Sequence, residues 1–236
     1  MLNRGCMSRN GLPMRRRALL GGAALVAGIA LLPGCATPSS GSRVDFAAAV
    51  QRLLERSTRN AFDSLTAPDG FWTSAVARVD MPTLFGKSDS LFKGILAAPA
   101  FREKLQRRLN RFAEDAARKA APVVAEAVRS LSVPDAYGVL RSGEPTAATT
   151  VLRAAMGPSL VNAMIPELDR VMRAANDPVL TQALSVLAGV NIGDAAQALA
   201  LETDNAIWYE VGAQEARIRE NPAATGDALL IAALSA

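Results

Sequence analysis

The side chains that carry out most enzyme chemistry are scarce in this chain. Its 236 residues include no histidine and only two cysteines, Cys6 and Cys35. Without histidine, the chain can form neither Ser-His-Asp nor Cys-His nucleophile pairs, nor histidine-ligated metal sites. It also has no Walker-type loop and no G-x-G-x-x-G fingerprint. The remaining options are carboxylate chemistry, a serine–lysine pair or an oxygen-ligated cation.

The acidic residues that could act in such chemistry all have simpler explanations. Glu114 and the acid after it lie in a predicted helix, where adjacent acids usually face water, and Arg118 has the i,i+4 spacing of an ion pair with Glu114. Asp135 is explained as a first-turn helix cap. Glu215 and Arg219 belong to a polar face near a helix end, expected to be solvated or paired. We therefore expect a protein that is not an enzyme, with no metal and no other cofactor.

Cys35 is a candidate for lipidation, because it directly follows a segment with the pattern of a secretory signal. Three arginines at 15–17 lead into an apolar run over 18–32, followed by proline, glycine and Cys35. This order is typical of a signal peptide, and residues 32–35 resemble the lipobox of bacterial lipoproteins. The apolar run is too short for a transmembrane helix, which needs about 20 residues. We expect cleavage after residue 34 and a lipid on the Cys35 sulfur.

The same segment predicts where the protein resides. Residues 16–20 also look like a twin-arginine export motif, so the general and twin-arginine routes stay open. Residues 1–13 precede a normal signal, and Met7 or Met14 could be the true start. Ala36 is not the aspartate that retains lipoproteins at the inner membrane in well-studied enterobacteria. By that resemblance we expect the cell envelope, and within it the outer membrane facing the periplasm.

Removal of the signal changes the charge of the chain. The full sequence carries a formal net charge of +4, with 26 basic and 22 acidic residues. Residues 1–34 hold five arginines and no acid, so the mature chain keeps 21 basic and 22 acidic residues, a net charge of −1. Such a balance gives no argument for binding nucleic acid. The expected partners are the membrane, through the lipid, and an envelope protein.

The elements that must position these side chains are helices. Residues 35–41 form the lipidated cysteine and a small, polar tether, and 42–236 form the domain. Apolar residues recur at helical spacing over 46–65, 100–121 and 194–220, with shorter helices between them. Ser42 and Ser132 open capping-box patterns, residues 71–82 read as an ordered loop, and Pro122 and Pro166 should kink or restart their helices. The prediction is all-α: a single compact multi-helix bundle with proline-kinked helices.

Several short segments of the mature chain resemble a known bacterial family. In chain order these segments are residues 67–71, 78–82, 109–114, 121–124, 131–136, 147–150 and 215–222. Together they resemble the envelope proteins grouped as domain of unknown function 4197. Phe112 stands where that pattern usually has alanine, and Val151 where it has tyrosine. The resemblance implies a helical, usually signal-bearing protein of Gram-negative bacteria with no established activity.

Polar residues within these segments define a candidate binding surface: Asn110, Glu114, Asp135, Thr149, Glu215 and Arg219. Asn110 and Glu114 share a helix face, and asparagine in mid-helix suggests a specific hydrogen bond, either structural or functional. The leading hypothesis is a non-enzymatic, lipid-anchored binding or structural protein. A second is a carrier of an apolar ligand, held between the proline-containing helices by Val123, Val124, Met164 and Ile165. A carboxylate-based enzyme is the third.

Overall fold

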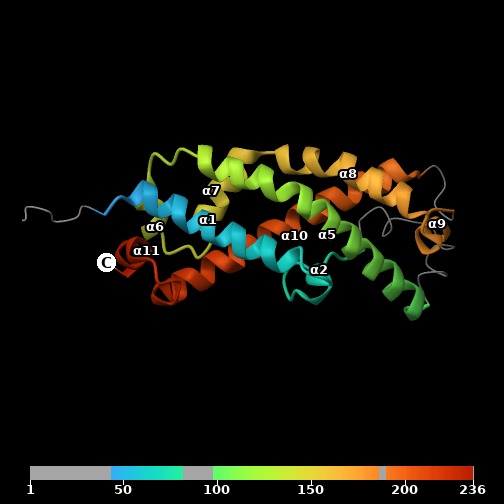
Figure 1. Cartoon of the computed structure of the whole chain (residues 1–236), viewed down its shortest axis with the longest axis horizontal. Coiled ribbons are helices and arrows are strands. Elements are labelled where there is room, and N and C mark those ends of the chain that lie inside the picture. The colour runs from blue at the N-terminus through green and yellow to red at the C-terminus, as the bar shows by residue number, and fades with distance from the viewer. Residues whose placement is uncertain (1–43, 82–97, 186–189, 236) are drawn as a thin grey trace, which may run out of the picture. The chain divides into compact units, whose positions relative to one another are not determined.

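A computed structural model describes residues 44–81, 98–185 and 190–235 (Figure 1). These residues contain nine α-helices, one 3-10 helix and no strand. The four long helices are α1 (Phe46–Leu65), α5 (Pro99–Ser130), α8 (Ser159–Ala175) and α10 (Ile192–Glu220). The predicted signal peptide, Cys35 and the tether lie outside the described residues. None of the described helices is long and apolar enough to cross a membrane.

The long helices pack into one bundle. α5 and α10 each contact both α1 and α8, and they also contact each other. The shared core is built from leucines and alanines at helical spacing, with Leu53, Leu109, Leu168 and Leu199 fully buried. Small side chains such as Ala116 allow neighbouring helix axes to approach closely. The all-α prediction is therefore confirmed for the described residues.

Short helices cover the two ends of the bundle. α6 (Ala136–Arg141) and α11 (Ala228–Ser235) pack against α1, and α7 (Ala147–Met156) packs against α10. At the other end, α9 (Pro178–Ser185) packs against α5. α2 (Gly70–Thr73) packs against α5 beside the end of α1, between the two ends of the bundle (Figure 1). The 3-10 helix η1 (Pro222–Thr225) links α10 to α11.

Two helix starts lie three residues later than the sequence pattern predicted. Ser42 lies outside the described residues, and the N-cap of α1 is Asp45, whose side chain accepts a hydrogen bond from the Ala48 N–H at 3.0 Å. The N-cap of α6 is Asp135, not Ser132. An aspartate at the fourth position of each pattern caps as well as serine does, so the pattern alone did not fix the register.

The structure excludes one of the two alternatives for the prolines and corrects the predicted loop. Pro122 lies inside α5 and Pro166 inside α8, and each helix continues on both sides of its proline, so neither restarts there. The segment expected as a loop from residue 71 begins instead with the single helical turn of α2, while residues 74–81 contain no regular element. Asp69, with φ of +57°, makes the sharp change of direction between α1 and α2.

Candidate functional site

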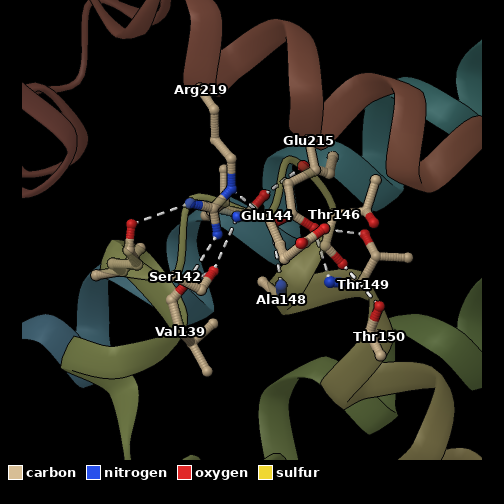
Figure 2. Close-up of polar contacts among 12 residues, drawn as sticks. Val139, Ser142, Glu144, Thr146, Ala148, Thr149, Thr150, Glu215 and Arg219 are labelled. Atoms are coloured by element: carbon tan, nitrogen blue, oxygen red, sulfur yellow. Dashed lines mark hydrogen bonds and ion pairs between the residues drawn. The ribbon is translucent and has the colours of Figure 1, made fainter.

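Glu215 is a fully buried carboxylate whose two oxygens accept four hydrogen bonds (Figure 2). Its Oε2 accepts from the N–H of Thr149 at 2.7 Å and from the Thr149 hydroxyl at 2.6 Å. Its Oε1 accepts from the Ala148 N–H at 3.0 Å and from Nε of Arg219 at 2.8 Å. The N-cap of α7, Thr146, makes no side-chain cap. A carboxylate on α10 therefore satisfies the free N–H groups that open α7.

Arg219 extends this contact to the preceding helix. One turn beyond Glu215 on α10, it donates from Nη1 to the Leu140 carbonyl at 3.1 Å and from Nη2 to the Val139 carbonyl at 3.2 Å. Those carbonyls belong to the last turn of α6, which has no later helical N–H groups to bond. The Glu215–Arg219 pair thus joins the end of α6 and the start of α7 to α10. No lone pair of the carboxylate is left for a ligand.

Asp135 and Asn110 are also engaged within the fold. The Asp135 side chain accepts from the Gly138 N–H at 2.9 Å, as an N-cap does. Asn110 is fully buried in α5, and its amide spans the backbone of Val79: the Val79 N–H donates to Oδ1 and Nδ2 donates to the Val79 carbonyl, both at 2.9 Å. Nδ2 also donates to the Gln106 carbonyl at 2.8 Å. Asn110 therefore holds the extended segment after α2 against α5.

We expect Asn110→Ala to lower the free energy of unfolding by about 1–3 kcal/mol. The change leaves the buried Val79 N–H without its partner and removes the shorter of two hydrogen bonds to the Val79 carbonyl. This range is the usual cost of stranding a buried polar group. Thermal unfolding followed by circular dichroism measures the effect. Gln106→Ala is the control, because the Gln106 side chain reaches the same Val79 carbonyl only at 3.3 Å and is partly exposed. An Asn110→Ala protein as stable as the wild type would contradict the structural role.

Glu114 is the one residue of this set whose bonding is incomplete. It is 5% exposed, and among the described residues nothing forms a hydrogen bond with its buried Oε1. The predicted ion pair with Arg118 is wrong, as is the expectation that Glu114 faces water. Arg118 instead pairs with Asp115 at 2.5 Å and donates to the Thr66 carbonyl at 3.0 Å, at the end of α1. These two contacts occupy the guanidinium, and no ion pair between it and Glu114 is present in the described residues.

The surroundings of Glu114 favour its neutral form. Burial is the main cause that raises the pKa of the Glu114 carboxyl above its ordinary value. The positive charges of Arg118 and Arg111 oppose the shift, while the negative charges of Asp69 and Asp115 add to it. A neutral carboxylic acid can donate a hydrogen bond as well as accept one. Glu114 is thus the candidate acid–base or binding residue of the set.

Glu114 lines a groove of about 470 Å³ between α5, α8 and the turn before α2. We call it the Glu114 groove. Its polar walls are Asp69, Arg108, Arg111, Asp115 and Arg118, and its apolar walls include Phe112 and Val171. The structure thus gives the residues of the candidate binding surface three different roles. Asp135, Thr149, Glu215 and Arg219 stabilise helix ends, Asn110 holds the segment after α2, and Glu114 opens on a groove.

Comparison with known proteins assigns the chain to a family. A family described as "Protein of unknown function (DUF4197)" matches residues 40–234, which is most of the chain. The protein belongs to the DUF4197 family. No curated protein and no solved structure matches the chain significantly. The DUF4197 match therefore begins within the predicted tether and extends into α11.

Sequence reasoning missed several residues of this DUF4197 domain that are buried and polar. Asp204 accepts from the Trp208 indole N–H at 2.9 Å and from Arg153 at 3.1 Å. Burial raises the pKa of Asp204, and the bonds from Trp208 and Arg153 oppose that shift. Glu210 accepts from the Ser74 hydroxyl at 3.1 Å. The four-residue spacing of Asp204 and Trp208 could have predicted their hydrogen bond. The bond between Ser74 and Glu210 joins residues 136 apart in the chain, so no local pattern predicts it. In the described residues, no cluster of three acidic or cysteine side chains could hold a metal ion.

Proposed function

We propose that this DUF4197 protein is a lipid-anchored envelope protein, facing the periplasm from the outer membrane, whose helical domain is a non-enzymatic binding module. The anchor is supported by the sequence: Cys35 ends a lipobox-like segment, and a small polar stretch separates it from α1. The binding role is supported by the Glu114 groove. It combines a buried carboxyl that is not fully bonded with arginine side chains at the surface.

The single observation that carries the binding role is that, of the three carboxylates in the candidate binding surface, only Glu114 is incompletely bonded within the fold. Asp135 caps a helix, and Glu215 has four donors on its two oxygens, so neither presents a free oxygen. An acid–base mechanism on this surface would depend on Glu114 without a second carboxylate of the same set. A binding site needs only one such group beside positive charges. Binding is therefore the better-supported role.

The apolar-carrier alternative has less support. Val124 and Met164 are fully buried in the core, and Val123 and Ile165 pack against it. These four side chains fill the space between the proline-containing helices instead of enclosing a ligand. The groove that does open, near Glu114, has mixed polar and apolar walls.

The test of the anchor is Cys35→Ser. We expect the wild-type protein to be recovered with the outer membrane and with a lipidated N-terminal cysteine, because the lipid needs the Cys35 sulfur. The variant should remain uncleaved or appear in the soluble periplasmic fraction. Fractionation and intact-protein mass spectrometry measure both results, with Cys6→Ser as the matched control that should behave like the wild type. A mature N-terminus elsewhere without lipid would refute the anchor, and recovery with the inner membrane would refute the location.

A further inference from the structure

The Glu114 groove has the features of a ligand site that the fold itself does not need. Asp135 and Glu215 use their carboxylate oxygens within the fold. Glu114 is only 5% exposed, and its Oε1 atom has no hydrogen-bond partner among the described residues. A buried polar atom left in this state costs free energy. Stability alone would favour an apolar residue there, as at the neighbouring buried Ala113 and Ala117. Because Glu114 also lines the groove, a ligand there can bond the same carboxyl group.

The charges around the groove favour an anion. Besides Glu114, three arginines and two aspartates line it, so the lining carries one net positive charge when Glu114 is neutral and none when it is ionised. Arg118 is held by Asp115, and Arg108 by Asp177 at the start of α9, at 2.5 Å. Arg111 is less restrained, because its guanidinium lies 3.9 Å from Asp69, beyond hydrogen-bond distance. Its donors remain available to a ligand.

The remaining charged groups near Glu114 do not change this balance. On α8, Glu167 and Arg170 form a closed pair at 2.5 Å. Asp69 lies between Arg107, at 3.8 Å, and Arg111, at 3.9 Å, so it is shared by two cations. The proton on Glu114 therefore decides whether the groove is positive or neutral.

The size and the apolar wall restrict the ligand further. A groove of about 470 Å³ is much larger than one water molecule, which takes about 30 Å³ in the liquid. Phe112 and the half-buried Val171 supply an apolar surface beside the polar groups. An anion with a small apolar body would use both walls. A carboxylate matches the planar fork of an arginine and accepts a short hydrogen bond from a carboxylic acid.

We propose that the Glu114 groove binds a small monocarboxylate with an apolar body, whose carboxylate accepts hydrogen bonds from the Glu114 carboxyl and the Arg111 guanidinium. The ligand keeps its charge, and Glu114 takes up a proton from solvent wherever it was ionised before binding. No covalent bond is made or broken. This inference deepens the proposed binding function and rests on it, but it is independent of the lipid anchor.

The experiment uses the protein purified from cells in a non-ionic detergent, titrated calorimetrically with sodium benzoate. Benzamide is the neutral analogue, and inorganic phosphate tests a different anion. We expect benzoate to bind and the other two not to. At pH values above the pKa of Glu114, the Kd of benzoate should rise by up to about tenfold per pH unit, because one proton is taken up with each ligand. Titrations in buffers of different ionisation enthalpy measure that proton directly.

Variants separate the proposal from a structural effect. Glu114→Gln should still bind benzoate but lose the proton uptake and the pH dependence, because an amide donates at every pH. Arg111→Ala should weaken binding tenfold or more, with Arg111→Lys intermediate, as expected for loss of the fork. Glu126→Gln is the matched control: an exposed acid on the same helix that pairs with Arg129. Circular dichroism verifies that each variant is folded.

Several results would overturn the proposal. Absence of benzoate binding would refute the site, and equal binding of benzamide would refute the role of the charge. Binding of phosphate in place of benzoate would refute the monocarboxylate class. Unchanged pH dependence in Glu114→Gln would remove Glu114 from the site. None of these results bears on the lipid at Cys35, so failure of the anchor and failure of the site are distinguishable.

Discussion

Replacing Glu215 with glutamine should lower the free energy of unfolding by about 3–5 kcal/mol, the usual cost of breaking a buried charge pair. The shape of the side chain is kept, but one of its two acceptor oxygens becomes an NH2 donor. Each oxygen of Glu215 now faces two donors, so either orientation of the amide places donors against donors. Arg219 also loses its counter-charge inside the protein.

Thermal unfolding measures this change, and a domain of this size should lose about 6–20 °C in Tm. Glu220→Gln is the control, because Glu220 is an exposed glutamate at the end of the same helix. That substitution should leave the Tm within a few degrees of the wild type. A Glu215→Gln protein that unfolds at the wild-type temperature would show that α7 and α6 do not depend on the contact with α10.

Gly70→Ala is expected to be the second most damaging change, with a loss of about 3 kcal/mol, at the upper end of the usual cost of overpacking. A Cβ atom on Gly70 would lie 2.3 Å from the Ser64 carbonyl oxygen and 2.7 Å from that of Leu65. Both are backbone atoms at the end of α1, so no change of rotamer relieves the clash. The turn between α1 and α2 would have to move, and with it Phe71, which is fully buried.

The control for this prediction is Gly212→Ala. There the added Cβ would meet the side-chain methyl of Thr146 at 3.0 Å, which a small adjustment can relieve. Alanine is also the better helix former, by about 1 kcal/mol. Chemical denaturation of both variants measures the two free energies. Equal effects would mean that the backbone contact at Gly70 does not explain its cost.

Two groups of residues in the candidate binding surface have different roles in this DUF4197 domain. Glu215, Arg219 and Thr149 join three helices at one end of the bundle (Figure 2). Glu114 lies on α5 beside α8, in a groove whose polar walls leave Arg111 weakly held. Variants of the first group should report on stability, and variants of the second on binding. Measuring both properties on every variant separates the fold from the function.

The sequence determined the helical architecture, because helix formation is local. Apolar spacing predicted α1 and α10 to within a few residues, whereas α5 continues through Pro122 to Ser130, nine residues beyond its predicted end. Local competition between caps was harder to resolve. Ser132 and Asp135 are both good N-caps three residues apart, and only the bond from Gly138 decides between them.

The tertiary structure decided which polar residues are buried, because burial depends on the neighbouring helices and not on spacing along one helix. Glu114 and Arg118 have the spacing of an ion pair, yet Arg118 bonds the Thr66 carbonyl at the end of α1 and pairs with Asp115. The Oε1 atom of Glu114 is left without a hydrogen-bond partner among the described residues. Glu215 appears in sequence as part of a polar face, and packing of α7 against α10 makes it a fully buried cap. Thr66, which accepts from Arg118, lies 52 residues away in the chain, and Thr149, which donates to Glu215, lies 66 residues away.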